Sequence, residues 1–397
     1  MTRREILVAG LFGSLLRGQE VESALFGGVF EAVWIAVRDQ FYDPNTRGVD
    51  WVEIKKEFGP RVSLCTSRKQ LLNLLRGMLR RLHNSHIFLY SREEWDLRQN
   101  ILPFSFERVG ERVFIRELLQ PNVAGDAPQY RFGDEILAVD RAPLGNLQPI
   151  SVATLQNVEA NPNFGPAASV AEVSIRRAGK TFIVKARRVT RPRGFRNVVM
   201  AEPVHGIKVM RILTLESAEL PEERLRELWS SIQPSRALVI DLRNCVGGDP
   251  KVSNFIAGGL LGEHKRLFAE IPRPGSGHPE SIEYSDAGVQ RYRGKLAILT
   301  NTNTESQPEV LAAICKEYGC ARVIGEHTAG ALNGWTTAIP LPDHFARFAL
   351  PYTRGVSPKG LSYEGRGIAP DEVVRNTSED YDHGRDRVLN RAIEEFQ

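Results

Sequence analysis

The sequence predicts a mixed α/β protein with a helical N-terminal segment, a β-rich middle module and a C-terminal α/β core. Three changes of pattern predict it. Apolar residues recur at helical spacing over 28–98, alternate with period two over 99–190, and form short continuous runs between helical segments over 191–397. Residues 1–27 form either an N-terminal helix or an export signal.

The composition is that of a soluble globular protein. The chain has 397 residues, of which 42% are hydrophobic and 25% charged, with a net charge of +4. Basic residues are scattered apart from the local run 187–196, so no nucleic-acid-binding stripe is indicated. The cysteines show no metal-ligand spacing, although Cys315 and Cys320 could pair if the protein is exported. We expect neither a metal nor a cofactor.

The N-terminus leaves the cellular location open. Arg3 and Arg4 precede an apolar run over 6–16, which resembles a twin-arginine export signal and is too short to span a bilayer. Glu5 and Arg17 argue against a signal, and no small-residue cleavage site follows. Export to a periplasmic or extracellular location and residence in the cytoplasm therefore both stay possible, and no stable membrane span is expected.

The helical segment ends at a corner that carries a histidine. Ser67 is a predicted helix cap, and the leucines that follow it lie on one stripe. The helix ends at "HNSH", where Ser85 suits a turn, and residues 87–90 suit a strand. His86 thus lies between two elements, either as a surface or capping histidine or as a functional group.

The middle module, 99–190, contains short alternating strands separated by glycine and proline turns. The stretch "GDAPQYRFGDEILAVD" and the paired strands "VSIRRAGKTFIVKARR" are similar to a PDZ domain. That resemblance implies a loop that binds the C-terminal carboxylate of a polypeptide while the peptide adds a strand. The loop would comprise Leu102, Pro103, Phe104, Ser105 and Phe106. The alternative is a structural module without a ligand.

The C-terminal region contains two suggestive strand ends. A buried strand over 237–242 leads to Gly247 and Gly248, whose backbones leave NH groups available for an anion. A second strand, "KLAILT", leads to Ser306 and Glu309 in the pattern S-x-x-E. This pattern predicts a helix-capping box, and it also suits a nucleophilic serine at a helix N-terminus.

Three motifs in this region resemble one peptidase family. They are "ALVIDLRNCVGGD", "LAILTNTNTESQPEVLAAICKEYGCARVIGEHTAGA" and "EGRGIAPDEVV". In this order they look like the core of the C-terminal processing and tricorn protease family, the S41 serine peptidases. With the entry segment "LRRLHNSHIFLY", the resemblance covers about 30–374. It implies a ClpP/crotonase-like core and a serine endopeptidase that forms an acyl-enzyme on unfolded or C-terminally presented polypeptides. The oligomeric state stays open.

The resemblance also implies the site residues. Ala331 stands where the processing branch has a lysine base, and no lysine occurs over 325–343. The tricorn-like branch uses a histidine that matches His86. Ser306 would then be the nucleophile and His86 the base. Ser85 and Glu364 would orient the imidazole.

The oxyanion of the reaction would be held by the backbone NH groups of Gln307, Gly247 and Gly248. With an ordinary histidine as base, activity should fall as the pH drops through about 6 to 7. The family usually has small residues where Gln307 and Pro308 stand, and Cys245 and Val246 are also unusual. A non-catalytic peptide-binding homologue and a hydrolase of another acyl substrate are therefore alternatives, and His327 is a rival base.

Overall fold

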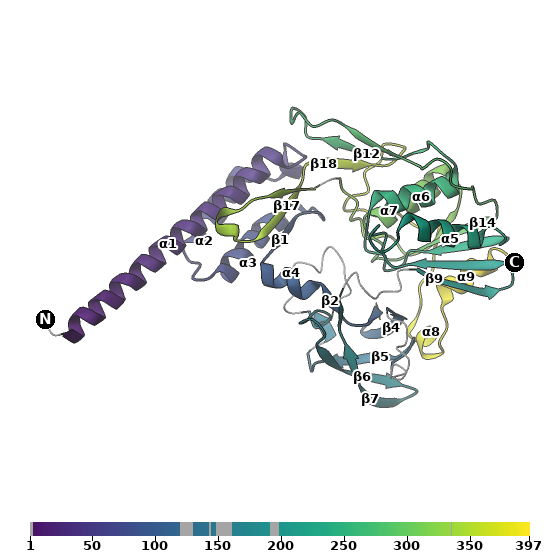
Figure 1. Ribbon diagram of the computed structural model, residues 1–397, viewed down its shortest axis with the longest axis horizontal. Coiled ribbons are helices and arrows are strands. Elements are labelled where there is room, and N and C mark those ends of the chain that lie inside the picture. Colours follow the sequence, from purple (N-terminus) through teal and green to yellow (C-terminus); the bar gives the residue numbers. More distant parts are fainter. Residues whose placement is uncertain (1–2, 120–129, 143, 148–160, 191–197, 335) are drawn as a thin grey trace. The chain divides into compact units, whose positions relative to one another are not determined.

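The computed structural model describes residues 3–119, 130–142, 144–147, 161–190, 198–334 and 336–397 (Figure 1). These residues form two compact units that alternate along the chain. The first unit comprises Met1–Arg92, Pro272–Pro279 and Gly334–Arg354. The second comprises Glu93–Ile271, Glu280–Asn333 and Gly355–Gln397. A mixed α/β fold with N-terminal helices is confirmed.

The first unit consists of helices and one small antiparallel sheet. The helices are α1 (Arg3–Gln40), α2 (Trp51–Val62) and α3 (Arg68–Leu79), with short 3-10 turns η1 (Thr46–Gly48), η2 (Arg80–Leu82) and η5 (Pro342–His344). The sheet has the order β1-β17-β16, with bounds Phe88–Tyr90, Arg347–Pro351 and Thr336–Ile339. Ser67 caps α3 by accepting a hydrogen bond from the Gln70 NH, as predicted.

The segment over 1–27, for which the sequence left two interpretations open, is helical from Arg3. It is part of α1, which has 38 residues. Over the ranges that the structure describes, no helix has both the length and the apolar character needed to cross a membrane. Export of the protein stays a prediction.

In the second unit, a five-stranded antiparallel sheet follows the short helix α4 (Arg92–Arg98). Its strands pair in sequence order: β3 (Phe104–Val109), β4 (Arg112–Leu118), β5 (Glu135–Val139), β6 (Val170–Arg177) and β7 (Lys180–Arg187). Nearby are the two-stranded pair β2 (Asn100–Ile101) and β8 (Val189–Thr190), and the turn η3 (Leu144–Asn146). The sheet has its own apolar core, while the likeness to a PDZ domain stays a prediction.

The largest sheet of the second unit has six strands in the order β19-β15-β14-β11-β10-β9. Their bounds are Glu372–Val373, Arg322–Gly325, Lys295–Thr300, Ala237–Asp241, Ile207–Ile212 and Val198–Val204. All neighbouring pairs are parallel except β10 with β9. A smaller sheet, β13-β12-β18, contains Ser281–Tyr284, Arg266–Pro272 and Thr353–Val356.

Helices bury the six-stranded sheet on both faces. They are α5 (Glu222–Ile232), α6 (Pro250–Leu261) and α7 (Gln307–Tyr318) on one face and α9 (Arg387–Glu394) on the other. The short helix α8 (Ser378–Asp382) instead packs Tyr381 against Phe114 of the five-stranded sheet. Leu238 and Ile240 of β11 pack in the core with α5, α6 and α7, whereas Val239 packs with residues of α9. Because successive strand residues face opposite sides, a strand covered on both sides must be apolar throughout. This explains the continuous apolar run of β11.

Candidate active site

Ser306 occupies a tight turn between β14 and α7. Its backbone angles are φ 63° and ψ −126°, in the left-handed region that residues other than glycine rarely adopt. Such a conformation costs about 1–3 kcal/mol and persists only where the surroundings enforce it. The Ser306 NH donates to the Ala331 carbonyl at 3.0 Å and to Glu309 Oε2 at 3.0 Å. These bonds hold the serine at the start of α7, in a geometry typical of a nucleophile on a strand-to-helix turn.

The side chain of Glu309 supports this turn through several hydrogen bonds. Its side chain is fully buried and accepts hydrogen bonds from the Gly330 NH and the Ala331 NH, both at 2.9 Å. The Thr328 hydroxyl donates to it at 2.5 Å. Burial raises the pKa of Glu309 to about 7, while these donors act to lower it. The predicted capping box is present, but Glu309 also ties the segment after β15 to the turn of Ser306.

Gly247 and Gly248 line the same turn, as predicted for the oxyanion hole. They adopt φ 108° and φ 141°, and a Cβ added to Gly247 would lie 3.8 Å from Ser306 Oγ. A Cβ on Gly248 would lie 2.1 Å from the Leu215 carbonyl carbon. Within the described ranges, no hydrogen bond is found for either glycine NH. The two glycines therefore fit a close approach of backbone donors to a bound anion.

A network of asparagines joins the two loops that carry Ser306 and the glycines. Asn301 Nδ2 and Asn303 Nδ2 both donate to Asn244 Oδ1, at 2.9 and 3.0 Å. The Glu305 NH donates to the carbonyl of Cys245 at 3.0 Å. The unusual Cys245 thus lies in the buried core and supports the turn through its backbone.

An ion-pair cluster anchors the motif D-L-R at the end of β11. The fully buried Asp241 pairs with Arg243 at 2.7 Å, and Arg243 also pairs with Asp386 at 2.7 Å. Burial alone would raise the pKa of Asp241, but Arg243, Arg211 and Arg116 together lower it well below its usual range. The cluster fixes the loop that leads to Gly247. This role was not predicted, although the charged residues Asp241 and Arg243 at the end of an apolar strand are a signal for it.

Gln307, the residue after Ser306, contacts a buried carboxyl group. Its Oε1 accepts a hydrogen bond from the Ser253 hydroxyl at 2.8 Å. Glu283 of β13 is 8% exposed, and among the described residues neither of its carboxyl oxygens has a hydrogen-bond partner of normal geometry. Burial, followed by the nearby Glu270, raises the pKa of Glu283 to about 7, whereas the Gln307 side chain lowers it. No local sequence pattern indicates this buried carboxyl group.

Glu364 lies in a loop that packs against residues 328–331, which support the turn of Ser306. The Gly365 NH donates to the Gly330 carbonyl at 2.7 Å, and the Ile368 NH donates to the Thr328 hydroxyl at 2.7 Å. Glu364 itself is 8% exposed. The structure therefore brings the loop of Glu364 to the segment over 328–331 that holds Ser306 in place.

His86 and Ser85 belong to the first unit and lie just before β1. The Ser85 hydroxyl and His86 Nδ1 are 2.7 Å apart, and the His86 NH donates to Asn84 Oδ1 at 2.9 Å. Burial lowers the pKa of His86 to about 4. The expected loss of activity between about pH 6 and 7 assumes an ordinary imidazole; with this pKa the loss is expected at lower pH, and it stays a prediction. Whether this pair meets Ser306 and Glu364 stays a prediction, because they belong to the other unit.

The predicted carboxylate-binding loop, 102–106, is in the second unit. Leu102, Phe104 and Phe106 are buried in the core of the five-stranded sheet, and Ser105 is half-buried. The Leu102 NH donates to the Asn163 carbonyl at 3.1 Å, and the Pro103 carbonyl accepts from the Leu119 NH at 2.8 Å. β3, which begins at Phe104, is an edge strand. Peptide binding there stays a prediction.

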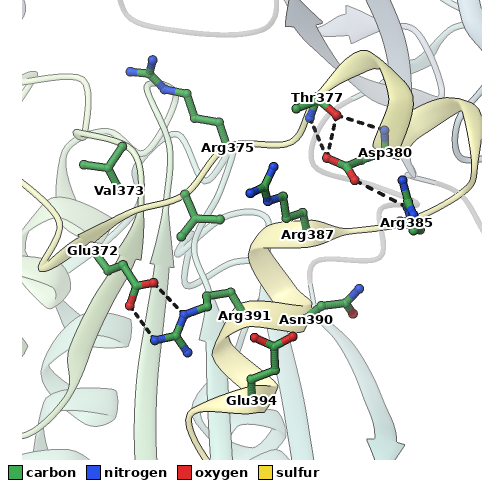
Figure 2. A pocket seen from close by; sticks show the side chains of 11 residues that line it. Glu372, Val373, Arg375, Thr377, Asp380, Arg385, Arg387, Asn390, Arg391 and Glu394 are labelled. Atoms are coloured by element: carbon green, nitrogen blue, oxygen red, sulfur yellow. Dashed lines mark hydrogen bonds and ion pairs between the residues drawn. The ribbon is translucent and has the colours of Figure 1, made fainter.

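A separate pocket lies between β19, α8 and α9 and contains none of the predicted site residues (Figure 2). Its volume is about 770 Å³. Most of its charged groups are paired, as Arg391 with Glu372 at 2.6 Å and Arg385 with Asp380 at 3.5 Å. As for metals, the residues with a described placement contain no cluster of three or more His, Cys, Asp or Glu side chains that could bind an ion.

Comparison with known proteins defines the class. Residues 208–374 match the model of peptidase family S41, and residues 24–80 match the tricorn protease C1 domain. The chain thus carries a peptidase domain of family S41, as the sequence motifs indicate.

Named relatives fall in both branches of the family. The chain is 28% identical over 159 residues to the tricorn protease of Thermoplasma acidophilum, which covers 40% of this chain and 14% of that protein. It is 28% identical over 265 residues to the carboxyl-terminal-processing protease of a Picosynechococcus species, which covers 64% and 59% respectively. The chain therefore spans less than two-thirds of either relative.

Solved structures share the fold. The photosystem II D1 C-terminal processing protease aligns with a TM-score of 0.57 and 21% identity, over 89% of this chain and 94% of that one. Mature CPAF aligns with a TM-score of 0.62 and 13% identity, over 94% and 96%.

Proposed function

We propose that this protein is a serine endopeptidase in which Ser306 attacks the carbonyl carbon of a peptide bond. The observation that carries the proposal is the strained backbone of Ser306 at the start of α7, beside Gly247. Four hydrogen bonds to the Glu309 side chain hold the turn of Ser306, so the fold maintains this serine in a conformation that costs free energy. Strain of this kind is common at catalytic residues, and it fits a serine that acts as a nucleophile.

In the proposed mechanism His86 removes the proton of the Ser306 hydroxyl. Because burial lowers the pKa of His86 to about 4, the imidazole is neutral at pH 7 and can accept a proton. Ser85 bonds to Nδ1, which leaves Nε2 for the nucleophile. Glu364 is proposed to stabilise the imidazolium that forms. This requires the two units to bring His86 to Ser306.

The tetrahedral intermediate would place its oxyanion against the NH groups of Gly247, Gly248 and Gln307. Each such donor is typically worth roughly 3 kcal/mol in the transition state. Collapse of the intermediate releases the amine, which takes the proton from His86, and leaves an acyl-enzyme on Ser306. Water then attacks the ester with His86 again as the base.

The proposed substrates are unfolded polypeptides presented through their C-termini. The support is the edge position of β3, because an edge strand can accept an added peptide strand next to 102–106. Calorimetry with peptides that carry a free or an amidated C-terminus tests this point. We expect the free carboxylate to bind more tightly, and equal affinities would contradict it.

The decisive experiment combines labelling by a fluorophosphonate probe with degradation of an unfolded protein. Ser306→Ala should abolish labelling, and His86→Ala should remove most turnover. The double variant should lose little more, since members of one catalytic unit are not additive. The exposed Ser230→Ala and His205→Ala serve as controls and should behave as wild type.

Three outcomes discriminate between the hypotheses. Full activity in His86→Ala would eliminate this mechanism. Labelling of Ser306 without cleavage of any polypeptide would favour a hydrolase of another acyl substrate. Absence of labelling together with peptide binding would favour a non-catalytic binding protein.

A further inference from the structure

The helix α7, which begins next to Ser306, ends in a motif that brings two cysteines together. Gly319 adopts φ 68° and ψ 26° after the last helical residue. The Cys320 NH donates to the Cys315 carbonyl at 3.1 Å, and the Gly319 NH donates to the Lys316 carbonyl at 3.3 Å. This pair of bonds defines a Schellman motif, in which the side chains at the two outer positions come into contact. Here both outer positions are cysteines.

The two thiols are accordingly neighbours. The Schellman motif sets their side chains against each other, and both are free thiols. Cys315 is fully buried in the apolar core above the six-stranded sheet, whereas Cys320 is half-buried and packs against the same core. Cys320 is therefore the cysteine of the pair that is partly exposed to solvent, and Cys315 is shielded from it.

The chemical environments of the two thiols shift their pKa values in opposite directions. Hydrogen bonding to Cys315 and the charge of Arg291 lower the pKa of Cys320, against the effect of burial. Its hydrogen bond to Cys320, followed by burial, raises the pKa of Cys315. Cys320 is thus the thiol that ionises first, and a thiolate is the reactive form.

We propose that Cys315 and Cys320 form a redox modification site, which hydrogen peroxide converts into a disulfide. The Cys320 thiolate attacks one peroxide oxygen, the O–O bond breaks, and a sulfenic acid forms while hydroxide leaves. The sulfur of Cys315 then attacks the Cys320 sulfur, the S–O bond breaks, and water leaves as the S–S bond forms. Two thiols are oxidised and one peroxide is reduced to two waters.

The disulfide would close a short loop at the end of α7. It would pin the last helical turn to the residue that leads into β15, and it would remove conformational freedom from the unfolded chain. We expect oxidation to raise the melting temperature by a few degrees, and dithiothreitol to reverse the shift.

A tryptic digest gives a direct readout, because Lys316 lies between the two cysteines. Trypsin should produce the peptides 296–316 and 317–322, each with one cysteine. After treatment with hydrogen peroxide, the two peptides should appear as one linked species whose mass is about 2 Da below their sum. Reduction before digestion should separate them.

Matched variants complete the test. Cys320→Ala and Cys315→Ala should each abolish the linked species, while Cys65→Ala should retain it, because Cys65 lies in the other unit. Oxidation of Cys320 to a sulfinic acid without linkage would overturn the proposal. So would alkylation of both cysteines in the oxidised, unfolded protein.

Discussion

Replacing Glu283 by glutamine should stabilise the protein at alkaline pH. The carboxyl group is 8% exposed and lacks a normal hydrogen bond among the described residues, and burial next to Glu270 raises its pKa to about 7. A carboxyl group that must ionise in such a place opposes folding, because water solvates the carboxylate in the unfolded chain but not in the folded protein. Glutamine has nearly the same shape and cannot ionise.

The size of the effect follows from the pKa. A rise from 4.5 to about 7 corresponds to roughly 3 kcal/mol, at about 1.4 kcal/mol for each pKa unit. Below about pH 4.5 the group is protonated in both the folded and the unfolded state, so the wild-type carboxyl costs nothing. As the pH rises from about 4.5 to 7 the unfolded state binds fewer protons than the folded state, so stability falls. The advantage of glutamine should therefore appear between about pH 4.5 and 7.

The assay is urea unfolding of wild type and Glu283→Gln at pH 4.5 and pH 8.5. We expect the difference in the free energy of unfolding to grow by roughly 3 kcal/mol between the two conditions. Glu280→Gln is the control, because Glu280 is half exposed on the segment before the same strand and should change little at either pH. A difference for Glu283→Gln that is independent of pH would refute the reasoning.

Three further predictions concern the site. Activity should persist below pH 6 and fall only near pH 4, since protonation of His86 removes the base, and a loss centred at pH 6.5 would contradict the burial of that ring. Gly248→Ala should lower kcat/KM by more than about tenfold, because its Cβ would clash with Leu215, whereas Gly28→Ala, at an exposed helical position with open space around its Cβ, should keep activity. Arg243→Met should lower the free energy of unfolding in urea by about 3–5 kcal/mol, because it leaves buried carboxylates without their partner. The exposed Arg224→Met should lower it by less than about 1 kcal/mol. Equal losses for the two variants would contradict a stabilising role of the buried ion-pair cluster.

Much of the architecture could be predicted from local patterns. The capping serine and leucine stripe of α3, the apolar run of β11 and the capping box at Ser306 each follow from periodicity and from known end signals, and each is present. These features depend on residues that are close in sequence. They could be predicted because the physical cause lies within about ten residues of the effect.

The supports of the site could not be predicted in the same way. Glu309 was expected to cap one helix, but it also binds Gly330 and Ala331 from a later segment. Glu283 is buried against Gln307 through the packing of a hairpin on α6 and α7, and no local pattern marks a buried carboxyl group. Such contacts depend on tertiary structure, which overrides local preference.

The alternation of the two units along the chain limits how the protein can be divided. β1, which follows His86, pairs Phe88 with Ala349, so the strand beside the proposed base is completed by residues more than 250 positions later. A fragment that stops at Arg92 would leave Phe88–Tyr90 without its hydrogen-bonding partner and would expose an unpaired edge. A separate polypeptide that contains His86 and folds as the first unit would need residues 334–354 supplied by circular permutation or by a fused copy. Cutting the chain at a single linker would not produce such a polypeptide.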